Sequence, residues 1–208
     1  VSLACILIFS MKQGQYGRAV KSSAHTMVEA APALLLAVPM VQVFINSASA
    51  DGSMLSMPLV LAQSAAALAG NAWPNVSPWV GSLGAFIAGS NTISNMMFAY
   101  FQFSTAQQIA LNLDQSAVVV ALQAVGGAAG NMICVHNVVA AGAVVGMMNR
   151  EGEVIRKTLI PFVFYCLQGG FIGQALITGN PLWWGLAAAW FVVLFALLYT
   201  RKSGNAEA

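Results

Sequence analysis

The stretch GSNTISNMMF, residues 89–98, holds the densest group of side chains that could do chemistry. Five of its residues carry uncharged hydrogen-bonding groups: Ser90, Asn91, Thr92, Ser94 and Asn95. No Asp, Glu, Lys, Arg or His occurs between Gly52 and Leu113. Hydroxyls and amides both donate and accept hydrogen bonds, so this cluster can bind a small polar or anionic guest without burying a charge.

The composition places this cluster in a lipid environment. The chain is 59% hydrophobic and 7% charged, whereas soluble domains carry about 25% charged residues. The charges lie in short islands, and the apolar stretches between them have about the 20 residues that cross a bilayer core. We therefore expect an all-α, polytopic membrane protein with about six to seven apolar segments, two of them interrupted or re-entrant.

Other classes of function find little support in the sequence. No basic stripe with interleaved aromatic residues is present, so nucleic acid is not expected as a partner. The three cysteines lie in apolar contexts without the spacing of metal ligands, so we expect no metal, cofactor or disulfide framework. The expected partners are the lipid bilayer and a small solute.

The apolar stretches divide a single transmembrane domain, residues 1–208. The chain opens inside an apolar run without an initiator Met, and we expect it to be a fragment that begins partway through a helix. A basic connection, 12–26, follows the end of that helix. The later segments are listed in chain order: helices 27–46 and 54–72, an interrupted or re-entrant hairpin 79–103, a broken helix 115–148, and a two-span hairpin 158–200.

Positive charges orient the last spans. Arg150, Arg156 and Lys157 precede the hairpin 158–200 and Arg201 and Lys202 follow it, so both ends are expected in the cytoplasm. The basic connection 12–26 would be cytoplasmic by the same rule. That requires an even number of crossings between 27 and 149. Either 79–103 crosses fully, or 12–26 lies on the outer surface despite its charge, and both alternatives stay open.

Two segments look like half-helices around an unwound polar middle. In 79–103 the middle is the cluster at Gly89–Asn95. Segment 115–148 would be about 51 Å long if fully helical, more than one span requires, and its middle, Gly126–Asn131, reads GGAAGN. Such interruptions mark binding sites in transporters, because the helix N-terminus attracts anions and unwound carbonyls attract small cations.

Close packing is the alternative interpretation of these small residues. Gly, Ser, Thr and Asn also bring helices together, and we interpret Gly81 and Gly84 in this way. For the whole polar cluster we favour a binding site.

His136 is the only Asp, Glu, Lys, Arg or His between Asp114 and Arg150, and it either carries a proton or, as a neutral ring, bonds a backbone carbonyl.

Three long motifs resemble the C-terminal part of the L-lactate permease family. They are GSLGAFIAGSNTISNMMFAYFQFSTAQ (81–107), LQAVGGAAGNMICVHNVVAAGAVVG (122–146) and MNREGEVIRKTLIP (148–161). The resemblance implies uptake of lactate, and often glycolate, with a proton across the bacterial cytoplasmic (inner) membrane. It also implies a longer parent chain.

The triplet Ser90-Asn91-Thr92 further resembles the signature of a broader ion-transporter group that includes dicarboxylate symporters. In that group the triplet lies at a hairpin tip and contacts the substrate carboxylate and the coupling ion. By this resemblance the break at Gly130–Asn131 faces Asn91, and Cys134 stands where a smaller residue such as Ala is expected. The implied substrate-binding residues are Ser90, Asn91, Thr92, Asn95, Gly130, Asn131 and Asn137, with His136 in proton coupling.

The resulting hypothesis is a secondary transporter for lactate. Sodium coupling is the first alternative, and a passive channel or a packing subunit of a membrane complex is another; a homo-oligomer stays open. An intramembrane hydrolase using Ser90 and His136 is not supported, because the sequence has no nucleophile elbow and no group to orient the histidine. We therefore do not expect an enzyme.

Overall fold

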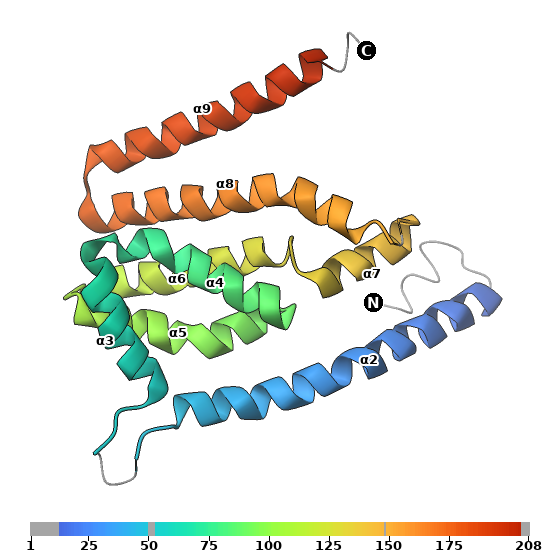
Figure 1. Ribbon diagram of the computed structural model, residues 1–208, viewed down its shortest axis with the longest axis horizontal. Helices are drawn as coiled ribbons and strands as arrows, with labels where there is room; N and C mark the ends of the chain where they lie inside the picture. Colours follow the sequence, from blue (N-terminus) through green and yellow to red (C-terminus); the bar gives the residue numbers. More distant parts are fainter. Residues whose placement is uncertain (1–12, 50–52, 148, 205–208) are drawn as a thin grey trace. The chain divides into compact units, whose positions relative to one another are not determined.

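The computed structural model describes residues 13–49, 53–147 and 149–204, and every regular element in these ranges is helical (Figure 1). The all-α prediction is therefore confirmed for this part of the chain. The expected helix end at 1–11 lies outside the described residues. The elements are α2 (Gln13–Ile45), α3 (Met57–Ala69), the 3-10 turn η1 (Gly70–Ala72), α4 (Trp73–Ala88), α5 (Asn91–Gln108), α6 (Leu113–Gly130), α7 (Val135–Val145), α8 (Glu151–Thr178) and α9 (Pro181–Gly204).

The described residues fall into two compact units, divided between Met40 and Val41, which we describe separately. In the first unit, the expected connection 12–26 is helical from Gln13 onward and continues without a break into 27–40. Its residues include Ala, Lys, Arg and Gln, which favour helix as strongly as apolar residues do. Arg18 Nε also donates to the Gly14 carbonyl at 3.3 Å. The prediction from polarity therefore placed the start of this helix at residue 27, whereas the helix begins at Gln13.

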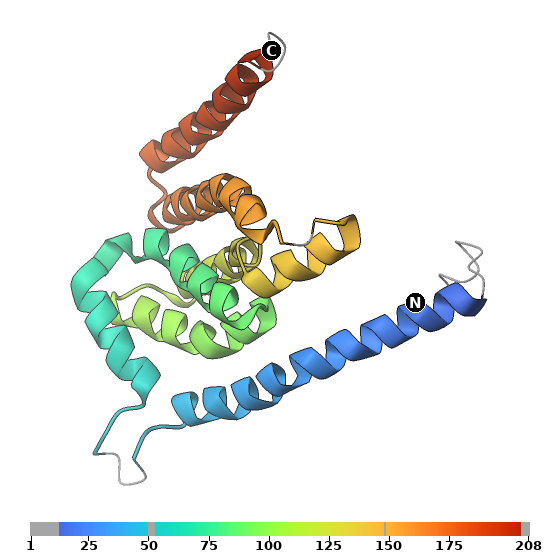
Figure 2. The same cartoon turned by 45° about the vertical axis from the view of Figure 1, so that its right-hand side comes forward.

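In the second unit, α4 packs against α5, α6 and α8, while α3 lies against α5 and α9 against α8 (Figures 1 and 2). An aromatic core holds one end of this group. The rings of Trp73 and Phe101 meet edge to face at 5.5 Å, and Val119 of α6 is buried in the same cluster. Helices α4, α5 and α6 thus share one core.

The segment 79–103 belongs to two helices, α4 and α5, that fold back on each other. Helix α4 begins at Trp73 because Pro74 suits a first turn. It ends at Gly89, whose φ of 67° is left-handed and therefore favours glycine. Ser90 then caps α5, its Oγ accepting from the Ile93 N–H at 3.4 Å. The interruption is limited to Gly89 and Ser90, and Asn91–Asn95 is helical.

The segment 115–148 is broken as well, but later than the predicted Gly126–Asn131. Helix α6 runs through Gly130, residues 131–134 separate it from α7, and the two helices are bent by 45°. The glycines remain helical because they lie against α4. A Cβ on Gly126 would overlap the Pro78 carbonyl, and one on Gly130 would overlap the Ser82 carbonyl. Close packing therefore explains GGAAG, as it does Gly81, whose Cβ would overlap the Gln123 carbonyl.

Among the described residues, α8 is the one helix long and apolar enough to cross a bilayer by itself. The bent pair α6 and α7 passes the same test together, and α9 has a shorter apolar stretch over Pro181–Ala196. Helices α8 and α9 form a C-terminal hairpin that turns at Gly179, where φ is 65°. The predicted number of spans stays a prediction.

We expect Gly126→Ala to destabilise the protein, because the new methyl group meets backbone atoms of α4 that cannot turn aside. Overpacking of this kind costs about 1–3 kcal/mol or more. Thermal unfolding of the purified full-length protein in detergent measures the loss. Gly185→Ala on α9 is the matched control, because no atom lies within 4 Å of its Cβ position; equal stability of the two variants would contradict the packing account.

Candidate functional site

The tip of the α4–α5 hairpin meets the break between α6 and α7. Asn137 Nδ2, on the first turn of α7, donates to the Gly89 carbonyl at 3.3 Å. The same amide also reaches Asn131 O at 3.4 Å and Asn131 Oδ1 at 3.2 Å. A Cβ built on Gly89 would lie 3.4 Å from Cys134 Sγ. Two interruptions that are 40 residues or more apart in sequence therefore form one site.

Both interruptions present the N-terminus of a helix. Helix α5 begins at Asn91 beside the hairpin tip, and α7 begins at Val135 beside the second break. The first N–H groups of a helix have no partner within it and carry a partial positive charge. Ser90 satisfies one of them in α5, whereas Cys134 makes no side-chain cap in α7. The site therefore offers backbone donors suited to an anion.

Two buried amide oxygens near the start of α5 accept no hydrogen bond from the described residues. They are Asn91 Oδ1 and Asn95 Oδ1, which lie one helical turn apart on the same face. Asn91 Oδ1 points at α6, where a Cβ on Gly127 would overlap it. A buried acceptor without a donor costs about 1–3 kcal/mol. Both oxygens are thus suited to a guest that brings a hydroxyl, or to a small cation.

The structure brings most of the predicted residues together. Around Gly89 lie Ser90, Asn131, His136 and Asn137, with Asn91 facing α6. Gly130 instead belongs to the contact with α4. Thr92 is exposed on the first turn of α5, next to the capped N-terminus.

His136 is exposed at the second break. Its Nδ1 lies 3.7 Å from Cys134 Sγ and 3.8 Å from the Cβ position of Gly89. The thiol of Cys134 is fully buried between these two positions. The imidazole therefore borders the polar site and is exposed in the described part of the chain.

Sequence reasoning missed two fully buried glutamines, Gln102 of α5 and Gln123 of α6. Their amides are bonded to each other at 2.9 Å. The signal was present, because a glutamine inside an apolar membrane segment must find a polar partner. Both glutamines lie outside the two predicted interruptions, Gly89–Asn95 and Gly126–Asn131, and were therefore not predicted as site residues.

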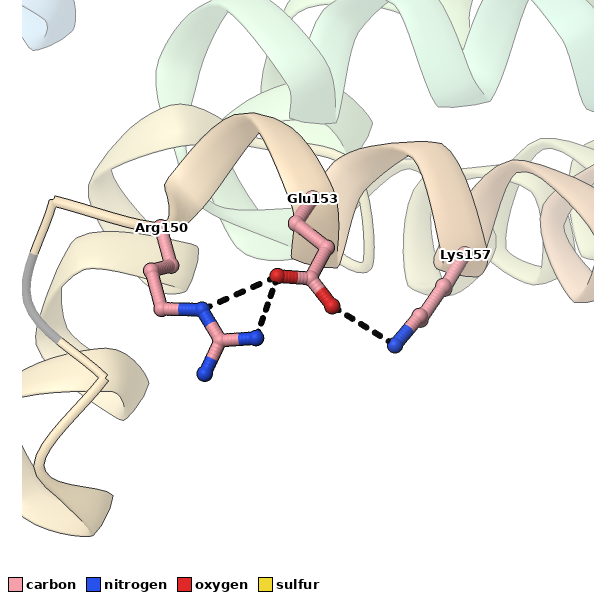
Figure 3. Close-up of polar contacts among 3 residues, drawn as sticks. All are labelled: Arg150, Glu153 and Lys157. Atoms are coloured by element: carbon pink, nitrogen blue, oxygen red, sulfur yellow. Dashed lines mark hydrogen bonds and ion pairs between the residues drawn. The ribbon is translucent and has the colours of Figure 1, made fainter.

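A separate charged cluster lies at the start of α8 (Figure 3). Glu153 accepts from Arg150 Nε at 2.9 Å and from Lys157 Nζ at 2.8 Å. All three side chains are substantially exposed, and exposed ion pairs contribute only about 0–1 kcal/mol. None of the hydrogen bonds of this cluster in the described residues reaches a residue of the polar site.

These features define a class: helical membrane proteins in which broken helices build a polar site within the apolar part of the fold. The family profile described as L-lactate permease matches residues 1–178. The chain therefore belongs to the L-lactate permease family. No solved structure matches it.

Curated relatives agree with this assignment. The chain is 41% identical over 114 residues to a putative L-lactate permease of Haemophilus influenzae, covering 55% of this chain and 21% of the relative. It is 36% identical over 125 residues to the glycolate permease GlcA of Escherichia coli K12, covering 60% and 21%. For the L-lactate permease of the same strain, the identity is 32% over 153 residues, covering 73% and 26%. The chain thus spans 21–26% of these relatives' length.

Replacing Asn137 tests the contact that joins the two interruptions. Asn137→Asp puts a carboxylate oxygen where the amide nitrogen faces carbonyl oxygens, so we expect a larger loss of thermal stability than with Asn137→Ala. The loss of the bond itself is expected to cost about 1–3 kcal/mol. Asn180→Asp is the matched control, because that side chain uses its oxygen, accepting from the Leu182 N–H at 2.9 Å. Greater tolerance of Asp at 137 than at 180 would contradict the assigned contact.

Proposed function

We propose that the protein to which this chain belongs is a secondary transporter that takes up lactate with a proton across the bacterial cytoplasmic membrane. Glycolate, a smaller 2-hydroxy acid, is the expected second substrate. One observation carries the proposal: the Asn137–Gly89 bond joins the hairpin tip to the break before α7. Family membership supports a permease, and the relatives named above include lactate and glycolate permeases.

Lactate presents a carboxylate and a neighbouring hydroxyl, and the site offers a partner for each. The carboxylate is expected at the N-terminus of α5, where backbone N–H groups and the hydroxyls of Ser90 and Thr92 donate. The substrate hydroxyl is expected to donate to a buried amide oxygen, and Asn91 Oδ1 is suited because it has no donor among the described residues. The Asn131 amide is the alternative partner for the substrate hydroxyl.

A co-transported proton would cancel the charge of lactate, which makes crossing the low-dielectric bilayer less costly. His136 is the residue we assign to this step, because a histidine side chain can bind and release a proton and this one is exposed beside Gly89. Sodium is the alternative coupling ion. The unpaired oxygens of Asn91 and Asn95 favour it, since hard oxygen atoms are what small cations bind.

The substrate proposal is tested by counterflow of labelled lactate into vesicles that contain the full-length permease. We expect Asn91→Ala to lower the initial rate about tenfold to a hundredfold, because a hydrogen bond to a charged or buried group contributes about 1.5–3 kcal/mol. Asn46→Ala is the control, an asparagine bonded only within its own helix end in the described structure. Undiminished counterflow after Asn91→Ala, with normal protein levels, would count against this site.

The coupling ion is tested with a pH gradient imposed in the absence of sodium. We expect wild-type vesicles to accumulate lactate, and His136→Gln to retain counterflow while losing accumulation, because exchange needs no net proton movement. Accumulation that requires a sodium gradient would replace the proton with sodium. Rapid equilibration without accumulation under either gradient would instead indicate a passive channel.

A further inference from the structure

A chain of hydrogen bonds with a fixed direction runs through the buried interior of α4, α5 and α6. It begins at Trp73, whose indole Nε1 donates to Gln102 Oε1 at 2.9 Å. An indole nitrogen can only donate, so this bond fixes which end of the Gln102 amide is oxygen. Gln102 Nε2 must then be the donor, and it donates to Gln123 Oε1 at 2.9 Å and to the Ser77 carbonyl at 3.3 Å.

The direction is passed on to the hairpin. With its oxygen engaged by Gln102, Gln123 presents Nε2 to Ser94 Oγ at 3.0 Å. Ser94 in turn donates its proton to the Gly81 carbonyl at 2.7 Å. Gln102, Gln123 and Ser94 are all fully buried. Both amide nitrogens reach a second acceptor as well, Gln102 Nε2 the Ser77 carbonyl and Gln123 Nε2 the Ser94 carbonyl at 3.4 Å. Reversing either amide would therefore set like atoms against each other.

This chain of hydrogen bonds ends close to the proposed substrate site. Ser94 lies one helical turn after Ser90, on the first turns of α5. On α6, Gln123 lies one turn before Gly127, which faces Asn91 Oδ1. Because the backbones of α4 and α6 are already in contact, the chain determines where the start of α5 lies against both of them.

We propose that Gln102 and Gln123 are positioning residues for substrate binding, which hold the α5 N-terminus and Asn91 in register with α6. The proposal rests on the proposed function for its substrate. If the two glutamines only held the helices together, a hydrogen bond with donor and acceptor in either order would serve. Positioning by this chain needs the specific order of donor and acceptor that Trp73 sets.

Gln123→Glu separates these roles through its pH profile. A protonated carboxylic acid reproduces the amide, accepting from Gln102 with its carbonyl and donating to Ser94 with its hydroxyl. A carboxylate only accepts, so Ser94 must turn toward it and leave the Gly81 carbonyl without its partner. In this one variant, the protonated acid therefore restores the chain of hydrogen bonds and the carboxylate breaks it.

The experiment is exchange of labelled lactate by full-length permease in proteoliposomes, with equal pH on both sides. Relative to wild type, we expect exchange by Gln123→Glu to rise at least about tenfold between about pH 8 and about pH 5. Gln123→Leu should be impaired at every pH. Gln108→Glu, which makes the same substitution at an exposed position at the end of α5, should track wild type. Exchange by Gln123→Leu equal to that of wild type would overturn the proposal, as would a Gln123→Glu ratio that stays constant across a pH range in which its carboxyl group ionises.

A second measurement reports on positioning without requiring transport. Ser90→Cys is introduced into a full-length parent in which every other cysteine, Cys5, Cys134 and Cys166 included, is replaced by Ala. Its labelling by a soluble maleimide is followed with and without Gln123→Glu. The ratio of the two rates is expected to rise with pH, as the carboxylate releases the first turn of α5. If wild type exchanges no lactate, the proposed function fails, and this ratio still decides the role of Gln123. A labelling ratio that does not change while the carboxyl group ionises overturns the positioning role.

Discussion

A helix that ends within an apolar environment leaves backbone groups that must find partners, because no water is there to supply them. At the end of α4, the Gly89 carbonyl finds its partner in Asn137, on a helix that begins at another interruption. The same amide reaches Asn131, on the residues before that helix. One interruption therefore supplies the hydrogen-bond donor, Asn137, and the other supplies the acceptor, the Gly89 carbonyl. The polar site forms where the two meet.

The surrounding contacts keep the two interruptions together. Glycines on α4 and α6 let the two backbones touch, with Gly126 against Pro78 and Gly130 against Ser82. Buried amide bonds then connect α5 to the same pair of helices. Shape and hydrogen bonding thus act on the same interface, so a guest bound at the start of α5 would meet a surface already fixed in place.

Local signals in the sequence predicted the first interruption and misplaced the second. Gly89 and Ser90 stop one helix and cap the next by their own conformational preferences, which a single sequence displays. The run from Gly126 to Gly130 has low helix propensity, yet it is helical because α4 lies too close for larger side chains. Packing against α4 therefore determines the conformation of this segment, and the local composition does not predict that packing.

The candidate site shows the same limit. Polar residues at the interruptions stand out in an apolar sequence, but the bond between Asn137 and Gly89 joins positions 48 residues apart. Gln102 and Gln123 are isolated amides within otherwise apolar helices, and nothing local indicates that they bond to each other. Residue types therefore identified the region, whereas the geometry of three packed helices identified the partners.

The central claim is that the ends of α5 and α7 enclose a carboxylate guest. The most direct measurement is a high-resolution structure of the full-length permease with lactate bound. The account predicts density for lactate between Gly89–Asn91 and Asn131–Asn137, with its carboxylate toward the N-terminus of α5. Lactate bound elsewhere, with these two interruptions apart or facing lipid, would contradict it.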